Sequence, residues 1–497
     1  MLIVKKRKNL MDELRCLHEL FPHASPRPGQ LAALEAIARM FRESIPVLIS
    51  EVPTGAGKSA LALTMARYAA TLTSSERGAY ILTPYNNLVQ QMTDGFRAFG
   101  LASLRGRKHY GTRTSNKYEH ARSCFLESPV SVTNYAYFMT ARHLPPRQVL
   151  IVDESHNLEK VLLSLVGFRI TPNLLLAAGV DTTPLSRPFT NESLKDWLGR
   201  SLFPALQREK SRCRDSAALR ELGFIATRVA KFIDLNDSSQ WIGWKDAEGV
   251  LNVKPLSVAT QARDLLAHGR FVLLQSATIF DFGVFQRTLG ISGKVTTFSA
   301  CSDFPVCNRP VIARPVGHMT KSAKEQTIPH LCAEIDRIVS RFRHSKGVIH
   351  THSYDINRAV TQYLATKHGG RVITHGNDQI EREEAITQHC KTDKPSVLVS
   401  PSITKGVDFA DELARFQIVC KIPYPRWNEY SRSRRTSEPK WYDLQTASAL
   451  VQMTGRAVRS NTDFATTFVL DSNFMEFVER SQSILPTWWL DAIQMET

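Results

Sequence analysis

The residues of this sequence with the clearest chemical role form a glycine-rich stretch over 51–59, which reads EVPTGAGKS. An apolar run over 46–50 precedes it and predicts a buried strand, and residues 60–66 predict the first turns of a helix. Strand, glycine loop, Lys-Ser pair and helix together form the context of a phosphate-binding loop. Gly55 and Gly57 permit a tight turn whose backbone N–H groups point at phosphate oxygens, and the helix N-terminus adds its positive dipole end.

Lys58 and Ser59 would act on different parts of a bound nucleotide. We expect Lys58 to reach the β- and γ-phosphates and Ser59 to hold Mg²⁺. The other loop residues expected to contact the nucleotide are Thr54, Gly55, Ala56 and Gly57. Val52 stands where the general pattern has its first glycine, so a glycine turn with a chance Gly-Lys-Ser is the alternative for the loop alone.

Two carboxylates follow a second apolar run, over 149–152. Asp153, at the end of the predicted strand, can hold Mg²⁺ through water, and Glu154 can orient and deprotonate the water that attacks a γ-phosphate. An isolated Asp-Glu pair after a strand is common. Behind a phosphate-binding loop, within one α/β unit, the pair predicts nucleotide hydrolysis.

Two further segments could complete such a site from elsewhere in the chain. Ser276 and Thr278 end another buried strand and could sense a phosphate or His156 through short hydrogen bonds. A predicted helix near the C-terminal end carries an amide and two guanidiniums at i, i+4 and i+7, on one face that could grip a γ-phosphate. These residues are Gln452, Arg456 and Arg459, and an exposed basic helix is the alternative.

Arg27 and Gln30 lie just ahead of the strand that leads into the glycine loop. The glutamine amide carries both a donor and an acceptor, so it could read a nucleotide base. The alternative is that Arg-Pro-Gly-Gln simply begins a helix, because that sequence is also a normal helix start.

Bulk composition places this chain among globular proteins with a polyanionic partner. Its 497 residues predict two or three domains, and 43% hydrophobic with 22% charged residues is ordinary for soluble proteins. The net charge of +16 favours nucleic acid first and an acidic membrane second. No apolar run approaches the ~20 residues of a membrane span, and the chain start does not resemble a secretory signal. The eight cysteines lack metal-ligand spacing, so we expect reduced thiols in a cytoplasmic chain without membrane contact.

The order and spacing of these motifs resemble superfamily-two helicases of the XPD/DinG type over nearly the whole chain. The resemblance implies an α/β fold of two RecA-like P-loop motor domains with parallel sheets and ATP between them, plus a mostly helical, arch-like insertion. The motifs that carry it are Arg27 and Gln30, PTGAGKS over 53–59, Asp153-Glu154-Ser155-His156, Ser276-Ala277-Thr278, Gly406-Val407-Asp408, Gln452-x-x-Gly455-Arg456-x-x-Arg459 and Leu485-Pro486-Thr487-Trp488. The domains expected are motor domain 1 over 1–160 and 251–285, the insertion over 161–250, and motor domain 2 over 286–497.

The resemblance also implies activity and residue roles. ATP hydrolysis with Mg²⁺ would drive movement along single-stranded DNA, 5′ to 3′, with Arg456 and Arg459 as arginine fingers and Gln452 at the γ-phosphate or attacking water. His156, Ser276 and Thr278 would couple hydrolysis to motion, and Gly406 and Asp408 would contact the nucleotide. Two alternatives stay open: a translocase that displaces proteins or acts on RNA or RNA–DNA hybrids, and a nucleic-acid-binding scaffold with weak ATPase activity.

The DNA partner would be single-stranded or forked. Its contacts are expected on loops after motor strands and on two segments that mix basic with aromatic residues, although solvated basic loops are the alternative. The expected contacts are Thr83, Arg107, Tyr110, Asn134, Thr351, Ser353, Ser400, Arg426 and Trp427.

The sequence departs from the family pattern at three places. Family members carry four cysteines for a [4Fe–4S] cluster between the P-loop and the DEAH box, but Thr112 replaces the first, and Cys124 alone remains in the reduced region over 105–128. Lys405 replaces the usual Glu before Gly406, and Ser155 replaces Ala in the DEAH box.

We therefore predict that the protein holds no iron–sulfur cluster, because such a cluster needs four ligands. Anaerobically purified protein is expected to contain no stoichiometric iron and to show no broad visible absorbance. Iron at about four atoms per chain, with that absorbance, would contradict the prediction.

Overall fold

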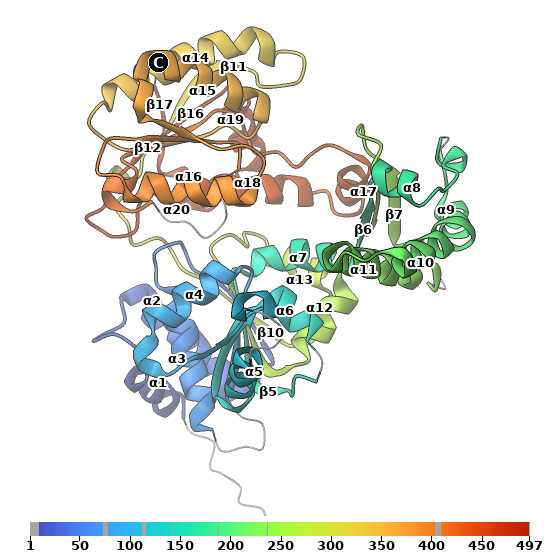
Figure 1. Ribbon diagram of the computed structural model, residues 1–497. Coiled ribbons are helices and arrows are strands. Elements are labelled where there is room, and N and C mark those ends of the chain that lie inside the picture. Colours follow the sequence, from blue (N-terminus) through green and yellow to red (C-terminus); the bar gives the residue numbers. More distant parts are fainter. Residues whose placement is uncertain are drawn as a thin grey trace, which may run out of the picture.

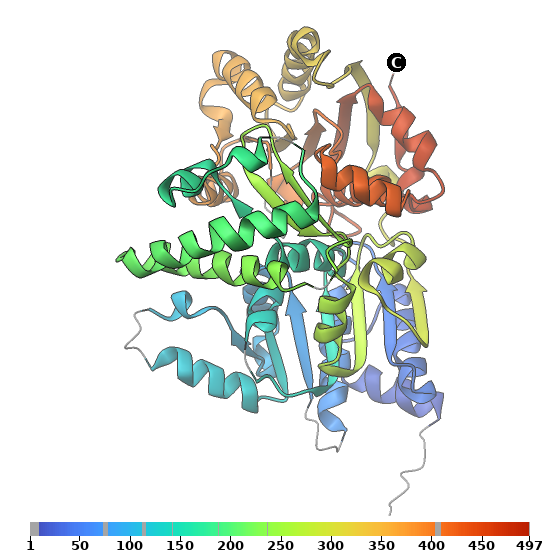
Figure 2. The ribbon, with the colours of Figure 1, turned by 90° about the vertical axis from the view of Figure 1, so that its right-hand side faces the viewer.

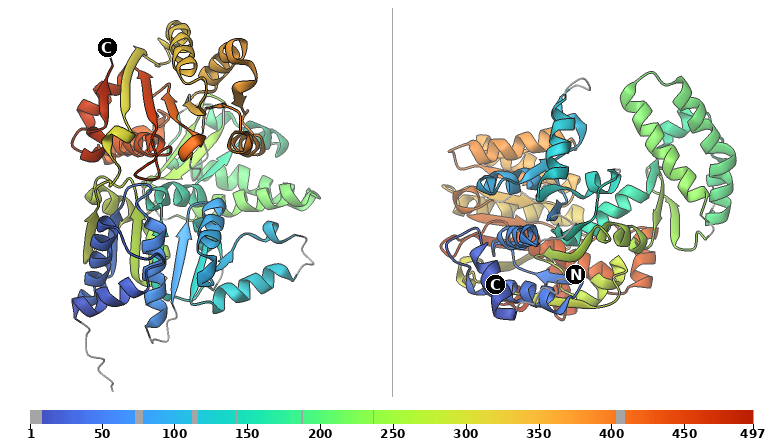
Figure 3. Two further views of the ribbon diagram at one scale, coloured as in Figure 1. Left: turned by 90° about the vertical axis from the view of Figure 1, so that its left-hand side faces the viewer. Right: turned by 90° about the horizontal axis from the view of Figure 1, so that it is seen from below.

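The computed structural model describes residues 9–72, 78–111, 116–141, 143–186, 188–235, 237–402 and 409–496. Two α/β domains lie one above the other, with the N-terminal domain below and the C-terminal domain above, and an arm projects from their side (Figure 1). The arm carries a pair of long helices and stands away from both domains when the molecule is seen from below (Figure 3, right). In the view of Figure 2, the arm lies in front of the junction between the two domains.

The first domain contains a seven-stranded sheet whose strands are all parallel. Most of its central residues are apolar and buried, as expected of a parallel sheet covered by helices on its faces. In spatial order the strands are β10 (Val295–Ser299), β1 (Val47–Glu51), β9 (Gly269–Ser276), β5 (Arg147–Asp153), β2 (Ala79–Thr83), β4 (Val130–Asn134) and β3 (Ala102–Leu104).

The helices of this domain follow their strands along the chain. Helix α3 begins directly after the glycine loop and is buried on nearly every side, because Ala, Leu and Met occupy most of its positions. The helices are α1 (Leu10–Glu19), α2 (Pro28–Glu43), α3 (Lys58–Thr71), α4 (Asn86–Gly95), α5 (Lys117–Glu127), α6 (Tyr135–Thr140), α7 (Leu158–Val166), α12 (Ala259–Leu266) and α13 (Phe282–Leu289).

The arm is an insertion that combines helices with a small antiparallel sheet. Its strands are β6 (Phe168–Ile170), β8 (Leu251–Pro255) and β7 (Trp241–Lys245), and its helices are α8 (Pro172–Ala177), α9 (Asn191–Trp197), α10 (Phe203–Arg212) and α11 (Ser216–Ile233). The expected end at residue 250 is wrong, because β8 pairs with both β6 and β7 and so keeps residues up to Pro255 in the insertion.

The second domain contains another seven-stranded parallel sheet. Its strands are β13 (Val372–Thr374), β14 (Val397–Ser400), β12 (Gly347–His350), β15 (Phe416–Val419), β16 (Thr466–Asp471), β11 (Val311–Gly317) and β17 (Ile493–Met495). Its helices are α14 (Lys324–Arg341), α15 (Tyr354–His368), α16 (Gln379–Lys391), α17 (Glu429–Ser437), α18 (Trp441–Thr454), α19 (Asn473–Ser481) and α20 (Thr487–Leu490). The expected boundary at 286 is wrong, because β10 pairs with β1 and extends the first domain to Ser299.

Helices α17 and α18 connect the second domain to the rest of the molecule. Figure 1 places α17 beside strands β6 and β7 of the insertion. Below them, the buried Glu159 carboxylate of α7 accepts hydrogen bonds from Arg434 Nη2 at 2.7 Å and from Trp441 Nε1 at 3.0 Å. The two domains are thus joined through a charged group that is largely removed from water.

Within the described residues, every helix is too short or too polar to span a lipid bilayer.

Replacing Arg434 by Met should destabilise the protein, because it leaves the Glu159 carboxylate buried without its cation. We expect a loss of about 3 kcal/mol and a lower unfolding midpoint in denaturant. Adding Glu159→Gln to Arg434→Met should recover part of that loss. Arg15→Met removes the exposed Arg15–Glu19 pair and should change stability by no more than about 0.5 kcal/mol, so equal effects of both arginine variants would contradict the prediction.

Candidate functional site

The glycine loop follows β1 and adopts the tight turn that its sequence predicts. Gly55 and Gly57 have φ angles of 77° and 87°, in the left-handed region that favours glycine. A Cβ atom on Gly57 would lie 2.1 Å from Gln30 Nε2, and one on Gly55 would lie 2.6 Å from the Phe304 ring. Val52, at the position of the missing first glycine, is only 1% exposed and packs in the core.

Arg27 and Gln30 support this loop from outside. Arg27 Nη2 donates to the Gly55 carbonyl at 2.9 Å, and Gln30 Nε2 donates to the Ala56 carbonyl at 3.0 Å. Gln30 Oε1 accepts from the Arg27 backbone N–H at 2.9 Å, so both ends of the amide already bind backbone. Neither side chain lines the cavity at the loop. In this structure both side chains bind backbone at and before the loop, and their contact with a nucleotide base stays a prediction.

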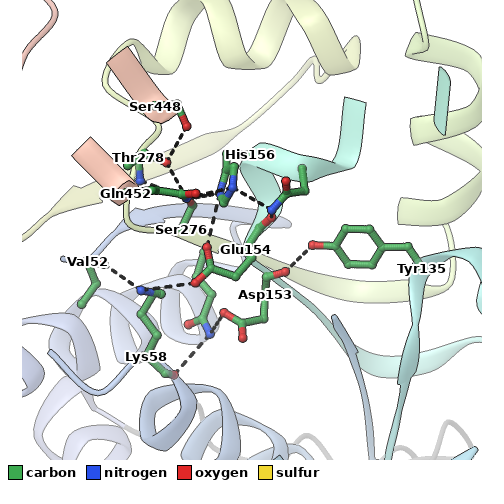
Figure 4. A network of polar contacts seen from close by, with 12 residues as sticks. Val52, Lys58, Tyr135, Asp153, Glu154, His156, Ser276, Thr278, Ser448 and Gln452 are labelled. Carbon is green, nitrogen blue, oxygen red and sulfur yellow. Dashed lines mark hydrogen bonds and ion pairs between the residues drawn. The ribbon is translucent and has the colours of Figure 1, made fainter. Parts of the chain in front are cut away.

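Lys58 begins α3 and points at the carboxylates that follow β5 (Figure 4). Its Nζ lies 3.6 Å from Glu154 Oε1 and donates to the Val52 carbonyl at 3.3 Å. Glu154 has a φ of 54°, an uncommon backbone conformation for a residue other than glycine, and such strain is frequent at active sites. Lysine and glutamate therefore meet where a terminal phosphate would lie.

Asp153 is oriented by Gln275 of the neighbouring strand β9 and by Tyr135, the first residue of α6. Gln275 Nε2 donates to Asp153 Oδ1 at 2.9 Å and to the Lys58 carbonyl at 3.2 Å. The Tyr135 hydroxyl donates to the Asp153 backbone carbonyl. Burial and the adjacent Glu154 carboxylate raise the pKa of Asp153 to about 6, although Lys58 and Gln275 oppose this shift.

Ser59 and Asp153 both line the cavity beside the glycine loop. A hydroxyl and a buried carboxylate are the oxygen ligands, direct or through water, that Mg²⁺ prefers. The negative charge of Asp153 is costly in this environment without a cation, so the residues present fit a magnesium ion. Bound Mg²⁺ would neutralise phosphate charge as the γ-phosphate is transferred.

His156 connects this carboxylate pair to the second domain. Its Nδ1 lies 3.3 Å from Glu154 Oε2 and 2.7 Å from Ser276 Oγ. Gln452 Nε2, from α18, lies 2.8 Å from His156 Nε2 and donates to Thr278 Oγ1 at 3.0 Å. Figure 4 shows this line of polar groups running from Lys58 through Glu154 and His156 to Gln452.

The arginines after Gln452 reach the same cavity, but not from the predicted helix face. Helix α18 ends at Thr454, and the Gly455 backbone N–H donates to the Val451 carbonyl at its end. Glycine is favoured at helix ends, which explains why the helix stops before Arg456. Arg456 and Arg459 therefore lie on the following loop, and both line the cavity.

The cavity between the two domains has a volume of about 330 Å³. The predicted site residues among those that line it are Thr54, Gly55, Gly57, Lys58, Ser59, Asp153, Glu154, His156, Gln452, Arg456 and Arg459. Residues that the sequence did not single out also line it, namely Pro84, Tyr85, Leu88, Gln91 and Asn157. Tyr85 could have been predicted as a site residue only from its position directly after the strand end at Thr83-Pro84. Gln275 was also not predicted as a site residue, although it directly precedes Ser276.

Four of the expected nucleic-acid contacts are buried. Thr83, Thr351 and Ser400 are at most 2% exposed, and Asn134 is 8% exposed. Their polar groups bind internal partners: Thr83 the Tyr85 carbonyl, Thr351 the Ser353 carbonyl, Ser400 the His375 ring, and Asn134 the Asn86 side chain and Tyr137 N–H. This corrects the expectation that these side chains touch a strand, because they shape the loop backbones instead.

The other expected contacts remain accessible. Arg107, Arg426 and Trp427 are exposed, and Tyr110 and Ser353 are partly exposed. Gly406 and Asp408, with Lys405 and Thr112, lie outside the described residues.

Comparison with known proteins gives matches in both domains. Residues 23–166 match the family described as type III restriction enzyme, res subunit, and residues 337–492 match the helicase C-terminal domain. A Fanconi anemia group J protein homolog of Gallus gallus is 28% identical over 105 residues, covering 18% of this chain and 8% of that protein. The ATP-dependent DNA helicase chl-1 of Caenorhabditis elegans is 28% identical over 125 residues, covering 23% of this chain and 15% of that protein.

A solved XPD helicase structure superposes with a TM-score of 0.65 at 12% identity, covering 95% of this chain and 100% of that chain. The two chains thus share an overall fold, while the two sequence families cover the segments with the glycine loop, Asp153-Glu154 and Gln452. Together the two matched segments and the shared fold support an XPD/DinG-type superfamily-two helicase. A helicase of this type would use a nucleotide and Mg²⁺.

The matched segments span only 8% and 15% of the two curated relatives, so the activities in the relatives' names are activities of those longer proteins. The absence of an iron–sulfur cluster from this chain stays a prediction. Cys124 is exposed, with its Sγ 3.7 Å from His120 Nε2.

Replacing Glu154 by Gln should abolish hydrolysis while keeping nucleotide binding, because the amide cannot accept a proton but fills the same space. We expect kcat for ATP to fall by about 10²- to 10⁴-fold, measured as phosphate release, with the Kd of a fluorescent ATP analogue unchanged or lower. Glu35→Gln, on the exposed face of α2, should leave both unchanged. Hydrolysis by Glu154→Gln within about threefold of wild type would exclude the general-base role.

Proposed function

We propose that this chain is an ATP-dependent DNA helicase that moves along single-stranded DNA and couples ATP hydrolysis to strand separation. The observation that carries the proposal is the contact of Gln452, from the second domain, with His156 and Thr278 of the first, beside the Lys58–Glu154 pair. Groups suited to hydrolysis and groups that join the two domains thus form one network.

In the proposed reaction, the phosphates of ATP take Lys58 from its present partner, Glu154. The freed Glu154 carboxylate then orients the attacking water and accepts its proton. Arg456 and Arg459 enter from the second domain and stabilise the charge that develops on the γ-phosphate. Because these arginines belong to the other domain, loss of the γ-phosphate removes an attraction that holds the domains together.

Movement follows from this dependence of domain closure on the nucleotide. His156, Ser276 and Thr278 bind one another and Gln452, so they are placed to pass a change at the phosphate to α18. We infer that repeated closure and opening shifts the two domains along a DNA strand, with 5′ to 3′ polarity taken from the family. The insertion would form the arch, and Arg107, Arg426 and Trp427 would contribute exposed contacts to the strand.

The test is the ATPase rate of the full chain with single-stranded DNA, single-stranded RNA, duplex DNA or no polymer. We expect single-stranded DNA to stimulate hydrolysis most, and Lys58→Ala to lower the stimulated rate by at least about 100-fold through loss of phosphate stabilisation. Stimulation mainly by RNA or RNA–DNA hybrids would instead favour a translocase on those polymers.

Forked DNA with a single 5′ or 3′ tail then tests polarity, since a 5′ to 3′ helicase unwinds only the substrate with the 5′ tail. Tight, salt-sensitive DNA binding by wild type without any turnover would exclude the helicase and favour a nucleic-acid-binding scaffold.

A further inference from the structure

A second open cavity, which we call the seam groove, lies between the insertion and the second domain. Its volume is about 440 Å³. The insertion contributes Arg169, Trp244 and Lys254 to its lining, and the segment at the start of α17 contributes Arg426, Trp427 and Arg432. The groove thus joins two expected strand contacts to insertion residues that no motif had singled out.

Aromatic rings form one wall of the seam groove. Trp244 of β7 stacks on Tyr430 of α17, with ring centroids 6.0 Å apart and an interplanar angle of 24°. Lys254 Nζ lies 5.9 Å from the Trp244 centroid and 5.4 Å from the Tyr430 centroid. The ammonium of Lys254 therefore lies near rings from both parts of the molecule, at the groove.

Positive charge in the groove exceeds the negative charge available to balance it. Five basic side chains line it, against the two carboxylates of Asp246 and Glu429. Asp246 accepts hydrogen bonds from the Val250 N–H at 2.9 Å and from Asn252 Nδ2 at 3.1 Å, so much of its acceptor capacity is used. Among the described residues, no carboxylate lies within ion-pair distance of Lys254. Burial and the nearby cations Arg169 and Lys160 lower the pKa of Lys254, and an anion in the groove would oppose that shift.

An exposed indole lies beside these cations. Trp427 is 51% exposed, although tryptophan usually buries its large apolar surface. The guanidinium of Arg432 lies 6.0 Å from its ring centroid and that of Arg435 lies 5.9 Å away. Tyr442 supports the ring edge-on at 5.6 Å, so the indole is held in place while one part of it faces solvent.

We propose that the seam groove binds one phosphate and an adjacent base of a nucleic-acid strand, with Lys254 and Arg432 at the phosphate and Trp427 stacked on the base. Excess cations suit a phosphate, and an accessible ring held by neighbours suits a base of any sequence. This inference rests on the proposed function and adds that the insertion itself holds the strand. A strand bound here would touch both sides of the seam, and so would join the insertion to the second domain.

The ion pair across the seam is consistent with this role. Arg426 Nη2 lies 3.2 Å from Glu248 Oε1, and both side chains are more than 60% exposed. An exposed pair of this kind contributes little stability and exchanges readily with other ions. A strand phosphate can therefore replace Glu248 at Arg426 at small cost.

The experiment measures binding of fluorescein-labelled oligo(dT) to the full chain over a series of salt concentrations. Lys254→Met keeps an unbranched apolar side chain and removes the charge, so it should weaken binding and reduce the slope of log Kd against log salt by about 0.7. Trp427→Ala should weaken binding at least fivefold, corresponding to about 1 kcal/mol of lost stacking, with an unchanged salt slope. Trp427→Phe and Lys254→Arg should restore most of the affinity.

The matched control is Lys394→Met, an exposed lysine that precedes β14, at the opposite edge of the second sheet from the site. The affinity, salt slope and basal ATPase activity of Lys394→Met should equal those of wild type. If Lys254→Met fails to fold, Arg432→Met tests the same phosphate contact, because that guanidinium is exposed. The proposed function would be overturned if the wild-type protein neither bound nucleic acid nor was stimulated by it. If the wild-type protein bound normally and the variants had the same Kd and salt slope, only the proposal that the seam groove binds the strand would be overturned.

Discussion

The register of three adjacent parallel strands determines where the chemistry of this protein can take place. β1, β9 and β5 are neighbours, with Glu51 opposite Ser276 and Gln275 opposite Asp153, so the glycine loop, the carboxylates and the hydroxyl segment all begin at one edge. A slip by one residue would turn each side chain to the other face of the sheet. Glu51 helps to fix this alignment, since its buried carboxylate accepts hydrogen bonds from the Ile279 and Phe280 N–H groups, and burial raises its pKa.

Two contacts then connect this edge to the second domain, and they differ in character. The contact of Gln452 with His156 and Thr278 is made by hydrogen bonds of an uncharged amide, which can exchange partners at modest cost. The Arg434–Glu159 pair is charged and buried, and breaking it leaves an uncompensated charge. A motor built on domain closure needs both kinds of contact, because one part of the interface has to change during each cycle while another keeps the domains together. The structure places the exchangeable contact beside the Lys58–Glu154 pair and the costly one on Glu159 of α7.

Sequence reasoning succeeded where a function depends on residues close together in the chain. The glycine loop, Asp153-Glu154 and Ser276-Thr278 each combine a strand with its own following loop, so short patterns sufficed to predict them. It failed where tertiary contacts decide, because β10 joins the first sheet through its pairing with β1, which no local pattern reveals. Hydroxyls such as Thr83 and Ser400 follow strands as expected, but their burial depends on neighbours from distant segments. Only part of the seam groove could be predicted from the sequence. Arg426 and Trp427 form a local cluster, whereas Lys254 comes from the insertion, far away in the chain.

The segment that departs most from the family pattern is held by aromatic and polar contacts within its described residues. Tyr118 and Tyr137 hydroxyls lie 2.6 Å apart, joining α5 to α6, and the pKa of Tyr137 is raised by burial and by this contact. The Arg107 guanidinium lies 4.2 Å from the Tyr118 ring centroid, and Tyr110 packs edge-on against the same ring. The last two contacts join the stretch after β3 to α5, and the first joins α5 to α6, so protein side chains define the geometry of this part of the first domain. All three contacts involve Tyr118, and the exposed Arg107 also pairs with Glu119 of α5, so the position of Arg107 depends on packing and charge on that helix.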